Sequence, residues 1–295
     1  MTTPKRSARR RGLRPRAATP RRREQRYAAG IIGAGNMATA LVRGFVAAKL
    51  FTSRQIQVSD AAPAQRRAAT RRLRVAATAD NRAVVRATRV VILAVKPQIL
   101  DAVLEEIRPE ATPRHLVLSI AAGVSTQRIE ARLGPGTRVV RIMPNTPALL
   151  RRGMSVVVRG RNATRADERL AVRLFRAVGA AVAVSDEGLL DAVTGLSGSG
   201  PAYVYRFAEA LIDGGIAAGL PQALAYQLAL QTIVGAAHML TETGETPQAL
   251  RAMVTSPGGT TVAGLTALDR REFTGTVAAA VQAATARSRE LGRAS

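Results

Sequence analysis

The chain has 295 residues, 47% of them hydrophobic, and a formal net charge of +24 from 44 basic and 20 acidic residues. This length suffices for one large domain or two medium ones with substantial cores. With no cysteine and only His115 and His238 as histidines, disulfides, thiolate metal sites and a cysteine nucleophile are excluded, and we expect no metal centre. No uninterrupted apolar run reaches the roughly 18 residues of a membrane span. We therefore expect a cytoplasmic protein without a membrane partner.

The first 26 residues are strongly basic. They contain eleven Lys or Arg and one acid, Glu24, and so carry +10, which leaves +14 for the other 269 residues. Arginine makes up 41 of the 44 basic residues in the chain, a bias typical of codon pressure on solvated positions. We interpret residues 1–26 as a disordered, dispensable tail or a misassigned translation start. A nucleic-acid-binding arm and an organelle transit peptide are the alternatives.

Between Tyr27 and Asp186, short β-branched runs alternate with amphipathic segments of helix length. The predicted strands are Ala28–Ile32, Gln55–Ser59, Val90–Val95, Leu116–Ile120, Val139–Met143, Ser155–Val158 and Ala181–Val184. The predicted helices are Met37–Ala48, Pro63–Leu73, Asn81–Ala87, Gln98–Ile107, Thr126–Leu133 and Arg165–Val178. Apolar strands separated by helices are typical of a parallel sheet covered on both faces, so residues 27–186 are predicted to form a doubly wound α/β domain.

After the acidic turn Ser185–Gly188 the strand-like runs stop, and residues 187–295 are predicted to form an all-helical domain. Its predicted helices are Ala202–Ala218, Gln222–Thr243, Pro247–Val254 and Phe273–Leu291. The segment Ala223–Leu240 is apolar nearly all round, so we expect it to be buried on every side. In a small helical domain such burial is easiest against a second copy, which favours a homodimer.

A glycine-rich turn, Gly33-x-Gly35-x-x-Ala38, lies where the first strand is predicted to meet the first helix. Gly33 permits a tight turn, and Gly35 lets a pyrophosphate approach the helix N-terminus. The context predicts dinucleotide binding, with a structural βαβ turn as the alternative. Asp60 at the end of the second strand suits NAD, whereas the neighbouring Ser59, Arg66 and Arg67 suit NADP, so this choice stays open.

Two later segments carry almost no ionisable side chains. Neither Leu196–Tyr203 nor Ser256–Thr261 contains Lys, His, Asp, Glu or Cys. Glycines and successive N–H groups can form a concavity suited to a carboxylate. We expect an enzyme whose cofactor supplies the chemistry while the protein positions the substrate. Lys96, in the turn after the third strand, could neutralise ligand charge, but a solvated loop lysine is the favoured interpretation.

Five segments together closely resemble pyrroline-5-carboxylate reductase, the enzyme of the last step of proline biosynthesis. They are Gly33–Ala38, Val95–Gln98, Met143–Pro147, Leu196–Tyr203 and Ser256–Thr261. The resemblance runs from about Ala28 to Leu291 and leaves the basic tail outside. It implies a Rossmann domain joined to a helical dimerisation domain, with dimers assembling into a ring such as a decamer. It also implies that NADPH, or NADH, reduces the cyclic imine 1-pyrroline-5-carboxylate to L-proline.

The resemblance assigns the substrate carboxylate to backbone groups of one segment and the imine nitrogen to Thr261, our candidate proton donor or relay. The substrate contacts it implies are Ser256, Gly258, Gly259, Thr260 and Thr261. The cofactor contacts expected from the glycine turn, the strand ends and the resemblance are Gly33, Gly35, Asn36, Met37, Ser59, Asn81, Ala94, Val95, Lys96, Pro97 and Ala121. A partner subunit could supply the substrate segment across the dimer.

Two rival functions are weaker. A related imine reductase or β-hydroxyacid dehydrogenase also joins a Rossmann domain to a helical one, but such dehydrogenases place a catalytic lysine where this chain has Val204. A polyanion-binding protein would be expected to interleave basic and aromatic residues, yet only 3% of the residues are aromatic. The composition therefore weighs against a nucleic-acid partner.

Overall fold

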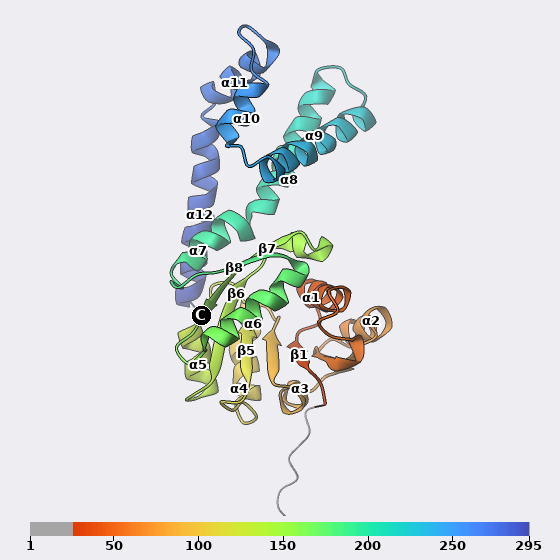
Figure 1. The fold of residues 1–295 in the computed structure, drawn as a ribbon, viewed down its shortest axis with the longest axis vertical. Helices are drawn as coiled ribbons and strands as arrows, with labels where there is room; N and C mark the ends of the chain where they lie inside the picture. Colours follow the sequence, from red (N-terminus) through yellow and green to blue (C-terminus); the bar gives the residue numbers. More distant parts are fainter. Residues whose placement is uncertain (1–25, 295) are drawn as a thin grey trace, which may run out of the picture.

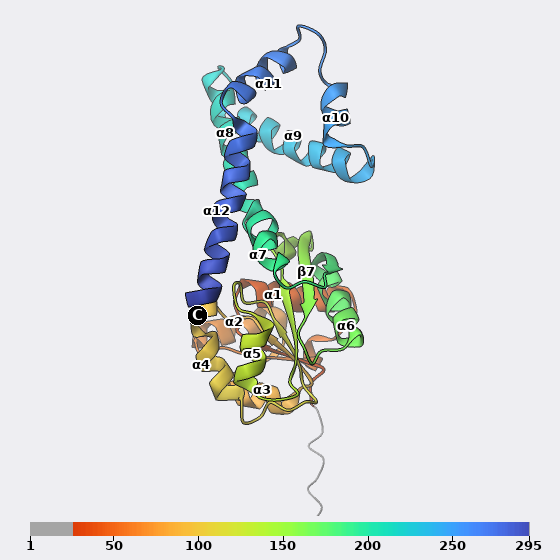
Figure 2. The same ribbon diagram turned by 90° about the vertical axis from the view of Figure 1, so that its left-hand side faces the viewer.

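The computed structural model describes residues 26–294, so the interpretation of residues 1–25 falls outside the described part. The strands are β1 Ala29–Ile32, β2 Ile56–Ser59, β3 Ala76–Thr78, β4 Val90–Leu93, β5 Leu116–Ser119, β6 Arg138–Met143, β7 Gly153–Arg159 and β8 Gly179–Ala183. They form one sheet in the order β3-β2-β1-β4-β5-β6-β7-β8. A group of helices extends from this lobe (Figures 1 and 2).

Helices cover both faces of the sheet, as the sequence predicts. They are α1 Asn36–Ala47, α2 Pro63–Leu73, α3 Asn81–Ala87, α4 Pro97–Ile107, α5 Thr126–Leu133 and α6 Arg165–Phe175. Successive strand residues alternate between two cores: Ile31 packs with α1, α2 and α6, whereas Ile32 packs with α3, α4 and α5. Phe45 and Phe175 are fully buried in the first core. This two-sided burial explains why most of the strand residues are apolar.

The far edge of the sheet differs from the prediction. Strands β1 to β6 are parallel, but β7 runs antiparallel to β6, and β8 follows the direction of β7. The link from β6 to β7 holds only the short 3₁₀ helix η2, Thr146–Leu150. A parallel return needs a crossover of about a dozen residues or more, so this short link enforces reversal. The all-parallel prediction is wrong for these two strands.

The C-terminal part contains only helical elements and turns. These are α7 Leu189–Val193, the π-helical turn η4 Thr194–Gly198, α8 Gly200–Ala217, α9 Gln222–Glu242, α10 Pro247–Met253, α11 Thr260–Arg270 and α12 Phe273–Ala294. The sequence analysis did not predict α7, η4 or α11, nor β3 and η1 Ser53–Gln55 in the sheet lobe. The predicted helix Arg165–Val178 is divided into α6 and the 3₁₀ helix η3 Arg176–Val178. Helix α12 returns to the lobe, where the Ser288 hydroxyl donates to Asp191 Oδ1 over 2.7 Å (Figure 2).

The extended helices bury little of their apolar surface within one chain. Among the described residues of α8 to α12, the only buried hydrophobic ones are Ala208, Ala225 and Ala229. The expected burial of Ala223–Leu240 on every side is therefore not achieved in a single chain, and Tyr226 is 56% exposed. By length and composition alone, α9 is also long and apolar enough to cross a membrane, with a mean hydropathy of 1.2. That criterion does not separate a membrane helix from a helix covered by another subunit.

The buried His115 at the start of β5 predicts a pH dependence of stability. Its Nδ1 accepts the Thr112 N–H over 3.0 Å, and burial lowers its pKa below the ordinary 6.5 because the imidazolium is poorly solvated. The unfolded chain thus binds the proton more readily, so the free energy of unfolding falls as the pH drops below about 6.5. In the variant His115→Gln, the free energy of unfolding measured by urea denaturation should depend less steeply on pH between about pH 7 and 5. An unchanged slope would remove His115 from this dependence.

Candidate functional site

Most of the predicted cofactor residues meet at the carboxyl edge of the sheet. Gly33 follows β1, the segment from Ala94 to Pro97 follows β4, and Ala121 lies just after β5. These strands are neighbours in the order β1-β4-β5, and Ala94 N–H donates to the Ile32 carbonyl over 2.8 Å. The chain order reverses between β1 and β4, which is the position where open α/β sheets bind ligands.

The glycine turn has two glycines with different structural roles. Gly33 has a φ of +99°, and a Cβ there would lie 2.6 Å from the Ala94 carbonyl oxygen, so only glycine fits. Gly35 is the N-cap of α1 and has an ordinary φ of −77°. A Cβ at Gly35 would meet nothing within 4 Å, and no side chain caps the helix. The turn therefore presents the first N–H groups of α1, at Asn36 and Met37, to an open position suited to an anion.

A polar chain lies beside the end of β2. The buried Ser59 hydroxyl donates to Asn81 Oδ1 over 2.7 Å, and Asn81 Nδ2 donates to Glu106 Oε2 over 2.7 Å. An ionised carboxylate only accepts, so Glu106 fixes the direction of the Asn81 amide. Ser59 and Asn81 are thus adjacent, and Glu106 is a third member that the sequence analysis did not identify.

Asp60 is occupied by the backbone of the two neighbouring turns. Its Oδ2 accepts the Ala34 N–H over 2.8 Å, and its Oδ1 accepts the Ala62 N–H over 2.9 Å. Arg66 donates to the carbonyls of Asp60 and Ala61 over 2.8 and 2.7 Å. Both side chains therefore help to shape this turn, in addition to any contact they make with a ligand.

The segment Ser256–Thr261, the second with almost no ionisable side chains, forms the connection into α11. Gly259 is the N-cap of that helix, Gly258 has a φ of +70°, and Thr260 and Thr261 are the first two helical residues. Gly259 N–H donates to the Ser256 carbonyl over 3.0 Å, which closes the turn. The segment is thus a glycine turn followed by a helix N-terminus, an arrangement whose free N–H groups favour a carboxylate.

The two predicted halves of the site do not meet within one chain. Figures 1 and 2 show α10 and α11 at the end of the helical extension that is remote from the sheet. The cofactor residues lie on α1, α3 and the strand ends of the sheet lobe. Within one chain, the residues from Ser256 to Thr261 are therefore separated from the glycine turn.

The segment Leu196–Tyr203, the first of the two with almost no ionisable side chains, lies at the junction between the sheet lobe and the helical extension. It includes the end of the π-turn η4, where Ser199 N–H donates to the Thr194 carbonyl over 2.8 Å. Asn145, after β6, donates through Nδ2 to the Ser197 carbonyl over 3.2 Å. Tyr203 donates to the Gly195 carbonyl over 3.2 Å. π-turns inside helices are frequent at functional sites, and this one ties the sheet to the start of α8.

An ion pair below this junction joins the helices to the sheet. The buried Arg141 of β6 donates to Glu187 Oε1 over 3.0 Å. The Glu187 carboxylate also accepts the Thr126 N–H over 2.8 Å and the Thr126 hydroxyl over 2.6 Å. Breaking such a partly buried pair leaves a charge without compensation, so Glu187 fixes where the helical extension leaves the sheet.

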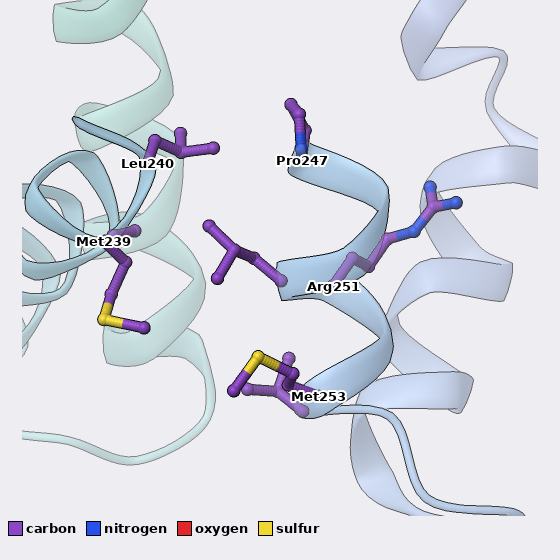
Figure 3. A pocket seen from close by; sticks show the side chains of 8 residues that line it. Met239, Leu240, Pro247, Arg251 and Met253 are labelled. Carbon is purple, nitrogen blue, oxygen red and sulfur yellow. The ribbon is translucent and has the colours of Figure 1, made fainter. Parts of the chain in front are cut away.

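An apolar groove of about 370 Å³ separates α9 from α10 (Figure 3). Its lining residues are Ala236, Met239, Leu240, Pro247, Leu250, Arg251, Met253 and Val254. Met253 and Val254 are 71% and 66% exposed and lie just before the Ser256 turn. Exposed apolar surface of this kind marks an interaction site.

Comparisons with known proteins identify the family. A family model for pyrroline-5-carboxylate reductase dimerisation matches residues 187–291, and one for NADP oxidoreductase, coenzyme F420-dependent, matches residues 28–123. The chain is 44% identical over 265 residues to pyrroline-5-carboxylate reductase 3 of Xenopus laevis, covering 90% of this chain and 96% of the relative. The chain belongs to the pyrroline-5-carboxylate reductase family. The reductase of Methanosarcina acetivorans is also 44% identical, over 264 residues that cover 90% of this chain and 97% of that one.

Solved structures of the family agree with this fold. A pyrroline-5-carboxylate reductase from Coxiella burnetii superposes with a TM-score of 0.83 at 36% identity, covering 90% of this chain and 98% of that one. The Plasmodium falciparum pyrroline carboxylate reductase, solved with NADP bound, gives a TM-score of 0.81 at 31% identity, covering 91% and 99%. The predicted Rossmann-type sheet is confirmed, and so is the helical region after it, which matches the dimerisation domain of the family.

The glycine turn generates a matched pair of substitutions. Gly33→Ala should destabilise the fold by about 2 kcal/mol or more, because it adds a Cβ at positive φ against a carbonyl. Gly35→Ala should leave the urea midpoint unchanged while weakening nicotinamide-nucleotide binding at least tenfold, because its Cβ occupies only the open position. Fluorescence titration with the reduced nucleotide measures the second effect. Equal stability losses in both variants would contradict this division of roles.

Proposed function

We propose that the protein is a pyrroline-5-carboxylate reductase that reduces 1-pyrroline-5-carboxylate to L-proline with a nicotinamide nucleotide. The observation that carries the proposal is the coexistence, in one family member, of the glycine turn at Gly33 and Gly35 with the Ser256–Thr261 turn before α11. The first suits a pyrophosphate and the second a carboxylate.

The reaction needs little from side chains. A bound nicotinamide nucleotide supplies the hydride that the imine carbon receives. The chain's own residues hold the substrate. Free backbone N–H groups of the Ser256–Thr261 turn and the start of α11 bind the carboxylate, and the Thr261 hydroxyl hydrogen-bonds the ring nitrogen and relays a proton to it. A protonated imine is already electrophilic, so orientation and charge complementarity supply much of the rate.

The proposed assembly is a homodimer that shares its active sites. Residues 27–186 would form the dinucleotide-binding domain and residues 187–295 the dimerisation and substrate domain, with dimers assembling further into a decamer. The exposed apolar side chains of α8 to α12 and the groove beside Met253 support burial against a second copy. In such a dimer the Ser256–Thr261 turn of one chain would lie over the cofactor site of the other.

The proposed cofactor is NADPH, with NADH as an alternative, in a cytoplasmic enzyme. The residues proposed to hold it are the eleven turn and strand-end residues, from Gly33 to Ala121, that the sequence analysis predicts as cofactor contacts. The uncapped N-terminus of α1 and the open space at Gly35 fit a pyrophosphate. The adjacent Ser59 and Asn81 fit an adenosine ribose at the end of β2.

The direct test is purified full-length protein with 1-pyrroline-5-carboxylate and either NADPH or NADH. We expect oxidation of the nucleotide and an equal amount of proline, identified by mass spectrometry. Absence of proline with both nucleotides would overturn the proposed function.

The proposed role of Thr261 predicts a selective loss of turnover. Thr261→Val keeps the shape and removes the hydroxyl, so kcat should fall by about a hundredfold while nucleotide affinity stays unchanged. Thr266→Val is the matched control, because the Thr266 hydroxyl donates to the Val262 carbonyl of its own helix over 2.9 Å. Equal turnover of the two variants would remove Thr261 from the mechanism.

The position of the Glu106 carboxylate beside Asn81 predicts that Glu106 lowers the affinity for NADPH relative to NADH. A 2′-phosphate beside Asn81 would approach a like charge, which Glu106→Gln removes. We expect this variant to raise the ratio of NADPH to NADH affinity roughly tenfold, as relief of about 1.4 kcal/mol would give. Glu105→Gln is the control: it removes the same charge one residue earlier, where Glu105 pairs with Arg132 over 3.2 Å. An unchanged affinity ratio in Glu106→Gln, measured by fluorescence titration, would refute this role.

A further inference from the structure

The strands β1, β2 and β3 all begin at one basic surface. Arg26 and Tyr27 lie just before β1, Arg54 before β2 and Arg74 before β3. Because these strands are parallel, their starts meet at the amino edge of the sheet, opposite the edge where the cofactor residues gather. This surface therefore lies apart from the proposed active site.

Two hollows share this surface. One, of about 410 Å³, is lined by Arg26, Arg54, Thr70 and Arg74 among others. The other, of about 380 Å³, is lined by Arg43, Ser53, Arg72 and Arg74 among others, so Arg74 belongs to both. Among the described residues, no acidic side chain lines either hollow. We call the five arginines (Arg26, Arg43, Arg54, Arg72 and Arg74) the amino-edge surface.

The charge here is not explained by the arginine bias of the whole chain. Residues 26–79 contain nine basic residues and one acid, Asp60, which gives a net +8 in 54 residues. Residues 80–295 contain 25 basic and 18 acidic residues, a net +7 in 216 residues. Codon pressure accounts for arginine in place of lysine, but it does not account for the local absence of acids.

The amino-edge guanidinium groups are available to a ligand. All five side chains are exposed, and none forms a salt bridge with an acidic residue in the described part of the chain. The helix dipole favours cations at the end of α2, which explains Arg72 and Arg74. It does not explain Arg26 or Arg54, which lie outside α-helices.

The surroundings select among polyanions. Between residues 26 and 79, Val46 is the large apolar side chain that is exposed, at 38%, which gives little to insert into a membrane. Phe45 is buried, and Phe51 packs edge-on against it with ring centroids 5.7 Å apart. Tyr27, which lines the first hollow, is half-buried, and the Arg26 guanidinium covers its ring at 5.5 Å from the centroid. Little aromatic surface is therefore left for an unpaired base. Arginine forks instead match phosphate oxygens. Residues 1–25, which lead directly into Arg26, add ten basic residues and one acid.

We propose that the amino-edge surface binds the phosphate backbone of double-stranded nucleic acid without reading its sequence. The scarcity of aromatic residues, which weighs against a nucleic-acid partner in the sequence analysis, concerns stacking on unpaired bases and not contacts with a duplex backbone. The cofactor and substrate sites at the other edge stay accessible in the complex. Sequence-independent binding of this kind depends steeply on salt, because each neutralised phosphate releases a counterion.

The test is fluorescence anisotropy of full-length protein with a labelled duplex of random sequence, across a series of salt concentrations. The surface variant is the triple substitution Arg54→Gln, Arg72→Gln and Arg74→Gln. The control triple, Arg161→Gln, Arg165→Gln and Arg169→Gln, removes the same charge from exposed positions in and just before α6. We expect the surface variant to bind at least tenfold more weakly and to lower the salt slope by about 2 to 3, and the control to stay near wild type.

Three outcomes would overturn the proposal. They are no duplex binding by the unaltered chain, equal losses in both triple variants, and binding to vesicles of phosphatidylserine and phosphatidylcholine at least as tight as to the duplex. Equal losses in both triple variants would show that net charge alone determines binding. Vesicle binding at least as tight as duplex binding would identify the surface as a membrane-binding one. Unchanged nucleotide affinity in the surface variant serves as the check that it folds.

Discussion

The apolar side chains of the helical extension impose the main constraint on this molecule. Among the residues of one chain whose burial is described, α8 to α12 bury only alanines as hydrophobic residues. Side chains such as Tyr205, Tyr226 and Met253 are 59%, 56% and 71% exposed. At roughly 25 cal/mol per Å² of apolar surface, leaving these faces in water is costly. The proposed dimer removes this cost by covering the exposed faces with a second copy. The same dimer would bring together the two halves of the site, which are separated within one chain.

The arrangement divides the work between the two lobes. The sheet lobe has its own two-sided core, and its carboxyl edge offers a glycine turn and an uncapped helix N-terminus. The extension carries a second glycine turn ahead of α11 but no core of its own. Arg141 and Glu187, together with the contact from Asn145 to the π-turn, fix the angle at which the extension leaves the sheet. In the proposed function both turns act through backbone groups, so neither needs an ionisable side chain.

The sequence was sufficient to predict the doubly wound sheet, because uninterrupted apolar strands report burial on both faces. It was not sufficient for the reversal of β7, since direction depends on the length of the link after Met143 rather than on strand composition. Helix α11 was missed because its glycine start and threonines resemble a loop, although Val262, Leu265 and Leu268 recur at helical spacing. The roles of Gly33 and Gly35 could be read from their motif. The hydrogen bond from Asn81 to Glu106 could not be predicted, because it joins two helices 25 residues apart in the chain and no local sequence pattern marks it.

In the proposed dimer, one subunit supplies the nucleotide-binding turn of each active site and the other subunit supplies the substrate-binding turn. Mixing the Gly35→Ala and Thr261→Val variants, each impaired on its own, tests this arrangement directly under conditions that exchange subunits and at a limiting nucleotide concentration. In a mixed dimer, one site then combines an intact glycine turn with an intact Thr261. We expect recovery of about a quarter of wild-type activity at equal mixing, since half the dimers are mixed and each has one intact site of two. No recovery despite proven subunit exchange would contradict it.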